Sequence, residues 1–110
     1  MKLPGGEKAV VDREKLAGYC LDPTHPRGKH KARVFAAVLG FTAHHADELR
    51  IALLHAAATQ DAEPAEDDRY GARYVIDFPI RGPSGTATLR STWIIRQGEA
   101  EPRLTSCYVR

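Results

Sequence analysis

The side chains best suited to chemistry in this chain lie close together, between residues 24 and 33. This segment holds the imidazoles of His25 and His30 and the cationic side chains of Arg27, Lys29, Lys31 and Arg33. Histidine can transfer protons near neutral pH, because its unperturbed pKa is about 6.5. Lysine and arginine stabilise charge on phosphoryl oxygens. The cluster has the residue types that cleavage of a phosphodiester requires, although a solvated basic loop would have the same composition.

This basic cluster is expected where a loop becomes a helix. Pro26 and Gly28 resist regular structure, whereas residues 29–39 have the composition of a helix. Backbone N–H groups at such a junction, with cationic side chains beside them, attract anions. Phosphate is the commonest biological anion at such sites.

A second polar set lies near the C-terminus. Side chains two apart in a strand share a face, so a strand over residues 103–109 places Leu104, Ser106 and Tyr108 on one side. Thr92, on the preceding predicted strand, is a further candidate for substrate binding. If the sheet folds against the basic cluster, these side chains meet around one cleft.

Such a cleft suits cleavage of RNA without a metal or other cofactor. The predicted catalytic residues are His30, Lys31, Ser106 and Tyr108, and the predicted substrate-binding residues are His25, Arg27, Lys29, Arg33 and Thr92. A histidine would transfer protons, Lys31 or Lys29 would stabilise the phosphate, and Ser106 with Tyr108 would hold the substrate. Which of His25 and His30 transfers protons is left open at this point. No metal site is expected, since His44, His45, Glu48 and His55 lack His-Glu-x-x-His spacing.

The elements that would position these residues are helices followed by strands. Apolar residues at helical spacing predict helices over residues 13–21, 29–39 and 43–59, with Asp12 and Thr42 as N-caps and Gly40 as a C-terminal stop. Alternation predicts strands over residues 70–81, 86–96 and 103–109, and a short strand over 8–11. We therefore predict an α+β fold, with three N-terminal helices packed on a C-terminal antiparallel meander of three to four strands.

Lys31 has a predictable position within this fold. It lies four residues before Phe35 on the second helix, so the two side chains share a face. If Phe35 is buried, Lys31 must emerge at the edge of the core near the sheet. The remaining apolar residues predicted for that face are Val34, Val38 and Leu39, and Ile51 and Leu54 are predicted to widen the face of the third helix.

Length and charge limit the class of protein. With 110 residues the chain fits a single domain, residues 1–110. The net charge of +2 does not by itself demand a nucleic-acid partner, and an acidic run over residues 61–68 is expected to be a solvated loop. Cys20 and Cys107 lack metal-ligand spacing. No membrane span or secretory signal is visible, so we expect a cytoplasmic protein.

Several segments resemble a known family. Leu3-Pro4-Gly5-Gly6-Glu7-Lys8-Ala9, His25-Pro26-Arg27-Gly28-Lys29-His30-Lys31-Ala32-Arg33, Trp93-Ile94-Ile95-Arg96 and Pro102-Arg103-Leu104 resemble an uncharacterised bacterial domain family, with Gly-Lys-His-Lys-Ala as the most specific part. Its members occur as stand-alone proteins and as C-terminal modules of polymorphic toxins, often beside a small partner gene. The resemblance implies a toxin or a toxin–antitoxin component, with an antitoxin or immunity protein as partner.

A weaker similarity links the chain to the barnase, EndoU, colicin and RelE-like ribonucleases. Ser106-Cys107-Tyr108 matches the Ser/Thr-x-Tyr spacing that EndoU-type members have late in their sheet. EndoU enzymes take two histidines from separate segments, whereas His25 and His30 lie in one. The sequence thus predicts a small ribonuclease-like toxin domain acting on RNA, with tRNA as one candidate. The alternative is a non-enzymatic binding module that forms one half of a two-protein complex.

Overall fold

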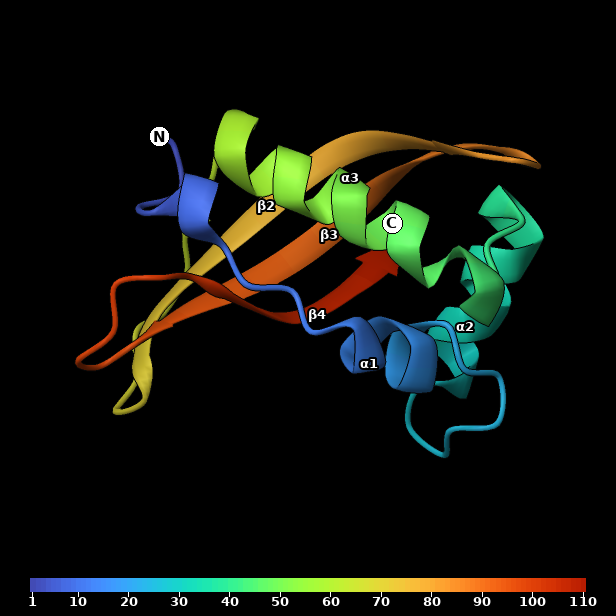
Figure 1. Ribbon diagram of the computed structural model, residues 1–110, viewed down its shortest axis with the longest axis horizontal. Helices are drawn as coiled ribbons and strands as arrows, with labels where there is room; N and C mark the ends of the chain where they lie inside the picture. The colour runs from blue at the N-terminus through green and yellow to red at the C-terminus, as the bar shows by residue number, and fades with distance from the viewer.

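Two long antiparallel strands form the centre of the computed structural model, which describes residues 1–110. They are β2 (Gly71–Gly82) and β3 (Gly85–Arg96), joined by a tight turn at Pro83 and Ser84. β4 (Arg103–Val109) pairs with the free side of β3, and the short β1 (Glu63–Pro64) pairs with β2. The sheet order is therefore β1-β2-β3-β4, all antiparallel (Figure 1). β1 lies within the acidic run that was predicted to be only a loop.

The helices precede the sheet in the chain. α1 (Arg13–Lys15) continues into η2 (Leu16–Cys20), α2 (Lys29–Val34) into η3 (Phe35–Leu39), and η4 (Ala43–His45) into α3 (Ala46–Thr59), while η1 (Gly6–Lys8) is a single turn. α3 crosses the long strands, and α1 and α2 lie beside the end of β4 (Figure 1). This arrangement confirms the predicted α+β fold, and no helix is long and apolar enough to cross a membrane.

The predicted helix ends are also confirmed. The Asp12 carboxylate accepts a hydrogen bond from the N–H of Glu14 at 3.0 Å. Thr42 accepts from the N–H of His44, and Gly40 has a φ of 73°, a left-handed conformation that glycine adopts without steric cost. These ends depend on local chemistry, which explains why the sequence predicts them.

One core lies between the helices and the inner face of the sheet. Trp93, Phe35, Leu49 and Leu53 are fully buried there. Ser91 is the one buried polar residue, and its hydroxyl donates to the carbonyl of Ile76 at 2.9 Å and accepts from Trp93 Nε1 at 2.9 Å. Both polar groups in the core are thus satisfied, which removes the cost of burying them.

Some predicted core positions were wrong. Val34, Val38 and Ile51 are 42%, 38% and 67% exposed. α2 and η3 contact the rest of the protein through a narrower stripe of Ala32, Phe35 and Leu39, because the sheet edge covers only one side of this helix. Apolar periodicity shows which side is buried but not how wide the buried stripe is.

The predicted strand over residues 8–11 is not formed. η1 occupies its beginning, and only Val10 pairs with β4, as a parallel bridge to Arg103. The N–H of Val10 donates to the carbonyl of Pro102, and the N–H of Leu104 donates to the carbonyl of Val10. The segment crosses the edge of β4 too briefly to form a ladder.

A bulge in β4 corrects the predicted side-chain alternation. Thr92 of β3 faces Ser106, yet the next residue, Trp93, faces Leu104, so Thr105 is an extra residue in β4. Leu104 consequently faces the core, 3% exposed, whereas Ser106 and Tyr108 remain partly exposed. The prediction that Leu104 shares a face with Ser106 and Tyr108 was therefore wrong.

Phe35 should be essential for stability. Phe35→Ala removes a fully buried aromatic ring and should lower the free energy of unfolding by roughly 3–5 kcal/mol. Val34→Ala, at the neighbouring exposed position, should cost well under about 1 kcal/mol. Urea denaturation of both variants measures the difference, and equal losses would contradict the assignment of Phe35 to the core.

Candidate functional site

The centre of the candidate site is the contact between α2 and the edge of β4. Lys31 extends from α2, and its Nζ donates a hydrogen bond to Ser106 Oγ at 3.1 Å. The side chain is only partly exposed, while Phe35 one turn later is buried. The predicted position of Lys31 at the edge of the core beside the sheet is thus confirmed.

Two tyrosine rings flank the Lys31 ammonium. Nζ lies 5.5 Å from the centroid of the Tyr108 ring and 5.6 Å from that of Tyr19. None of the ion pairs in the structure includes Lys31. Aromatic faces attract a cation without neutralising it, so the charge of Lys31 is stabilised but uncompensated. An anion bound there would have little competition from protein carboxylates.

Tyr19 was not recognised in the sequence as a site residue. It falls at helical spacing from Leu16, which made it look like part of an ordinary buried stripe. In the structure its ring also packs edge-on against the His25 ring, with centroids 4.6 Å apart and an interplanar angle of 65°. The sequence around Tyr19 does not distinguish a core residue from a site residue. Its site contacts, Lys31 and His25, come from other segments of the chain.

His25 is held in one orientation and one tautomer. Its Nδ1 accepts hydrogen bonds from the N–H groups of Arg27 at 3.0 Å and Gly28 at 3.1 Å. A nitrogen that accepts two N–H groups cannot carry a proton itself, so the proton of the neutral ring is on Nε2. His25 is therefore prepared to donate a hydrogen bond from Nε2.

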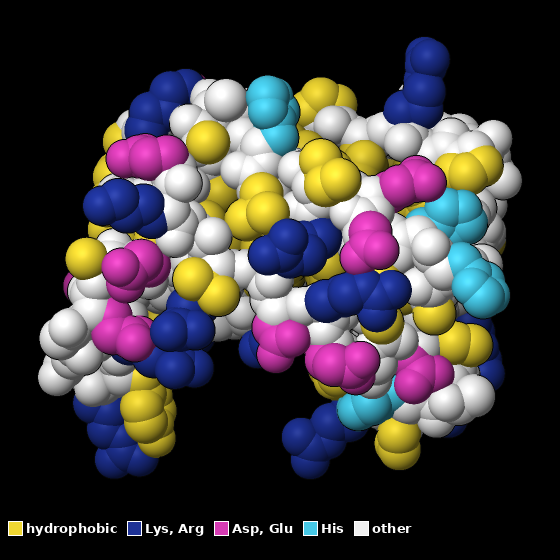
Figure 2. Space-filling model, viewed as in Figure 1, with side chains coloured by type: hydrophobic (Ala, Val, Ile, Leu, Met, Phe, Trp, Pro, Cys, Tyr) yellow, Lys and Arg dark blue, Asp and Glu magenta, His cyan; other side chains and the backbone are white.

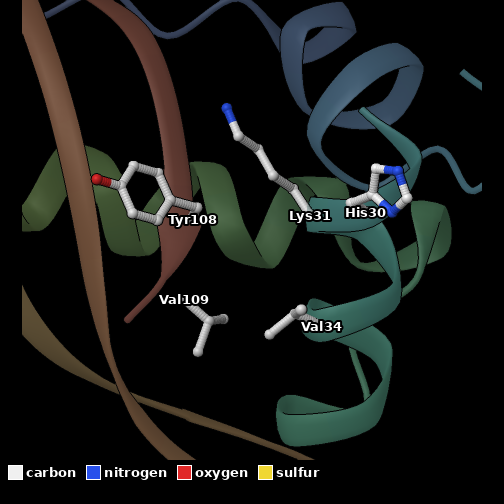
Figure 3. Close-up of a pocket in the computed structure, with 5 residues that line it drawn as sticks. All are labelled: His30, Lys31, Val34, Tyr108 and Val109. Carbon is white, nitrogen blue, oxygen red and sulfur yellow. The ribbon is translucent and has the colours of Figure 1, made fainter. Parts of the chain in front are cut away.

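His30 differs from His25 in every respect. It is exposed, at the first turn of α2, and makes no hydrogen bond within the chain. It belongs to the rim of a pocket of about 260 Å³ whose other lining residues are Lys31, Val34, Tyr108 and Val109. Figure 3 shows Lys31 between His30 and Tyr108, with the His30 ring turned away from the pocket. Both ring nitrogens of His30 are thus without a partner in the chain.

The remaining predicted residues divide into two groups. Thr92 lies close to the site, because its hydroxyl is 2.6 Å from that of Thr105 and donates to the carbonyl of Ser106 at 3.3 Å. Arg27 and Arg33 are exposed, Lys29 is partly exposed, and none of these three lines the pocket. The structure thus brings Lys31, Ser106, Tyr108 and Thr92 together, with His30 at the rim of the pocket.

A charged network extends from Tyr108 across the outer face of the sheet. Arg90, opposite Tyr108, forms two hydrogen bonds of 2.8 Å with the Asp77 carboxylate. Arg110 adds a third bond to Asp77 at 2.9 Å. Asp77 and, more weakly, the Tyr108 phenol raise the pKa of Arg90. The guanidinium therefore remains a cation beside the Tyr108 hydroxyl.

Two free cysteines lie behind the Lys31–Ser106 contact. Cys20 and Cys107 are fully buried and are not joined by a disulfide. The neighbouring Cys107, helped by the charge of Lys31, lowers the pKa of the Cys20 thiol despite its burial. The neighbouring Cys20, together with burial, raises the pKa of the Cys107 thiol. No group of three or more His, Cys, Asp or Glu side chains is arranged to hold a metal ion.

Comparison with known proteins identifies the family. The chain belongs to the family described as "Domain of unknown function (DUF6883)", which matches residues 2–110. No curated protein matches the sequence. Membership in a domain family of unknown function agrees with the resemblance noted in the sequence.

The fold itself is shared with a solved structure. A chain of the "Contact-dependent growth inhibition toxin - immunity protein complex from Klebsiella pneumoniae 342" superposes with a TM-score of 0.64. The two chains share 16% sequence identity, and the match covers 93% of this chain and 100% of that chain. At this identity the similarity concerns the fold alone.

The Asp77 network should make stability depend on pH in acid. The hydrogen bonds from Arg90, and next the one from Arg110, hold the pKa of Asp77 below its ordinary value of 3.8. Because this pKa is lower in the folded protein than in the unfolded chain, the carboxylate stabilises the fold above pH 3.8, and this contribution is lost as the pH falls through the folded pKa.

Asp77→Asn should therefore lower the free energy of unfolding at pH 7 by about 1 kcal/mol or less, because the ion pair is partly solvated. The difference in the free energy of unfolding between Asp77→Asn and the wild type should disappear as the pH falls toward 2. Urea midpoints measured from pH 7 to pH 2 check this, with Asp67→Asn as the control, since Asp67 is exposed and takes part in no ion pair. A gap that is constant with pH would contradict the assigned cause.

Proposed function

We propose that this member of the DUF6883 family is a toxin-like module that cleaves RNA by acid–base chemistry. The observation that carries the proposal is the uncompensated ammonium of Lys31 at the edge of β4. It is flanked by Tyr19 and Tyr108 and bonded to Ser106, and it lies between a histidine and a phenol. The His30 ring must rotate inward from the position seen in Figure 3 to face a phosphodiester on Lys31. The phosphodiester would then have one proton-transfer group on each side, as an in-line displacement requires.

The proposed reaction begins at the ribose 2′-hydroxyl. His30 removes its proton, the 2′-oxygen attacks phosphorus, and the bond from phosphorus to the 5′-oxygen breaks. The phenol of Tyr108 protonates the leaving 5′-oxygen and is reprotonated from solvent, to which His30 releases its proton. The products are a 2′,3′-cyclic phosphate and a 5′-hydroxyl. Lys31 stabilises the charge on the non-bridging oxygens throughout.

His25 has a different proposed role. With Nδ1 occupied by two backbone N–H groups, Nε2–H can donate to a phosphoryl oxygen but cannot accept a proton. We therefore assign His25 to substrate binding and His30 to proton transfer. Ser106 and Thr92, beside Lys31 on neighbouring strands, supply hydroxyls for the sugar or phosphate.

The comparison supports the toxin context of the proposal. The similar solved chain comes from a complex of a toxin with an immunity protein, and that description covers both proteins. The concentration of Lys31, the two tyrosines and the two histidines favours the toxin half for this chain. By the same reasoning, the proposed partner is a small immunity or antitoxin protein.

The alternative function is a binding module without catalysis. Val34 and Val38 are exposed one turn apart beside the pocket, and exposed apolar residues next to a cation suit a protein partner. A catalytic protein should be toxic when expressed alone, and His30→Asn should remove that toxicity. A binding module should show little toxicity, both as the wild type and as His30→Asn.

Cleavage should survive chelation and depend on His30. Purified protein incubated with total RNA or tRNA in EDTA should release fragments that end in a 2′,3′-cyclic phosphate, detected by mass spectrometry. His30→Asn should lower kcat by about 10²–10⁴-fold. His25→Asn keeps an acceptor for the two backbone N–H groups and should raise KM more than it lowers kcat.

His55→Asn is the matched control for these variants, because His55 is also an exposed helical histidine but lies on α3. Intact RNA from a folded wild-type sample, or equal activity of His30→Asn and His55→Asn, would refute the proposed mechanism.

Lys31→Met tests the phosphate-binding role separately. Methionine preserves the apolar stem and removes the charge, so the melting temperature should stay the same or rise, because no partly buried ammonium remains. Binding of a 2′-O-methyl oligonucleotide, which cannot be cleaved, should weaken. If the variant unfolds, or binds the oligonucleotide as the wild type does, Lys31 is a structural residue and the site lies elsewhere.

A further inference from the structure

A second basic hollow lies at the opposite end of β4 from Lys31. Its lining residues are Val10, Asp12, Lys15, Arg96, Arg103 and Leu104, and its volume is about 100 Å³. Two of its lining residues, Val10 and Leu104, are joined by a backbone hydrogen bond. α1 supplies Lys15 from one side, and the ends of the β3–β4 hairpin supply Arg96 and Arg103 from the other.

The cations of this hollow are poorly compensated. Lys15 and Arg96 take part in no ion pair or side-chain hydrogen bond of the structure, and Arg103 contacts Glu99 only at 3.3 and 3.4 Å. Asp12 is the one carboxylate in the lining, and one of its oxygens already accepts from the N–H of Glu14. With Glu99 counted as the partner of Arg103, three cations face two carboxylates, so the hollow keeps a net positive charge that attracts an anion.

The shape of the molecule leaves this region open. Figure 2 shows a deep notch in the outline between two lobes, with Lys and Arg side chains along its left wall. In Figure 1 the left lobe contains the β3–β4 turn and the right lobe contains α1 and the loop after η2. Of the residues that line the hollow, Arg96 and Arg103 come from the ends of the β3–β4 hairpin, and Asp12 and Lys15 come from α1 and its N-cap.

A polar track connects the hollow to Lys31. The strand register places Arg103 opposite Ile94, Ser106 opposite Thr92 and Tyr108 opposite Arg90, which lie at alternate positions of β3 and therefore share a face. The hydroxyls of Thr92 and Thr105 lie between Arg103, at the hollow, and Tyr108, beside Lys31. At about 3.3 Å per residue, Arg103 and Tyr108 are about 16 Å apart along β4, a distance that a short oligonucleotide spans.

We propose that the hollow of Lys15, Arg96 and Arg103 binds a second phosphodiester of the same RNA strand that is cleaved at Lys31. This inference rests on the proposed function for the identity of the ligand. Single-stranded RNA would run along the outer edge of β4, with one phosphate at each end of the track. The hollow is then a subsite for binding and does not take part in the chemistry.

The test removes the charges of the hollow without touching the catalytic residues. Lys15→Gln combined with Arg96→Gln is compared with Lys8→Gln combined with Arg81→Gln, which removes the same charge from exposed positions outside both pockets. Binding of a 2′-O-methyl octanucleotide is followed by fluorescence anisotropy over a range of salt concentrations. Thermal melts verify that both double variants are folded.

The subsite double variant should bind the octanucleotide about tenfold more weakly, and its log–log salt slope should be smaller by about 0.7, because one phosphate contact is lost. The control variant should change neither quantity to this extent. A dinucleotide, which is too short to span the track, should bind all three proteins alike. Equal behaviour of the two double variants with the octanucleotide would overturn the inference.

Two further outcomes separate this inference from the proposed function. If the wild type cleaves RNA and the subsite variant has an unchanged KM for long RNA, the subsite is refuted and the cleavage proposal stands. If no RNA is cleaved but octanucleotide binding depends on Lys15 and Arg96, the subsite stands and the cleavage proposal fails.

Inorganic phosphate distinguishes a free anion from RNA as the ligand. The amide resonances of Val10, Asp12 and Leu104 should shift with micromolar octanucleotide and remain unchanged with inorganic phosphate at the same concentration. If inorganic phosphate reproduces the shifts, the hollow binds a free anion and the assignment to RNA is overturned.

Discussion

The burial of Phe35 is the constraint on which the candidate site depends. With this ring fixed in the core, the helix that carries it has only one orientation against the edge of β4. Lys31, one turn earlier on the same side, must then leave the core at the point where the strand passes. Its ammonium finds Ser106 and two tyrosine rings but no carboxylate. The fold thus holds an unpaired positive charge at a partly buried position. There it attracts an anion more strongly than it would in bulk water, because the local dielectric constant is lower.

The bulge in β4 is the second device that forms the site. In a regular strand, a core position at Leu104 would turn Ser106 and Tyr108 toward the core as well. The extra residue, Thr105, shifts the alternation by one, so that Leu104 and Cys107 both face inward. Tyr108 is thereby placed on the outer face, where its ring meets Lys31 and its hydroxyl lies beside Arg90. Bulges often serve to redirect a functional side chain in this way.

The structure also separates two histidines that the sequence treats alike. Both lie in one short segment, yet the ring of His25 closes the loop by accepting two backbone N–H groups, while His30 projects from the helix without a partner. One imidazole is therefore committed to a single tautomer, and the other keeps both nitrogens available. The similar solved chain shares the fold at only 16% identity, so the assignment of roles depends on these contacts in this chain.

Local chemistry in the sequence was sufficient to predict the helices, their caps at Asp12 and Thr42, the hairpin and the position of Lys31. Each of these depends on residues within one or two turns of each other, or on simple alternation. The exposure of Val34 and Ile51, the bulge at Thr105, the role of Tyr19 and the tautomer of His25 could not be predicted in this way. The first three depend on which distant segment covers a side chain, and periodicity does not contain that information. The tautomer depends on the backbone conformation of the loop over residues 25–28, which directs the N–H groups of Arg27 and Gly28 at Nδ1 and which residue types alone do not specify.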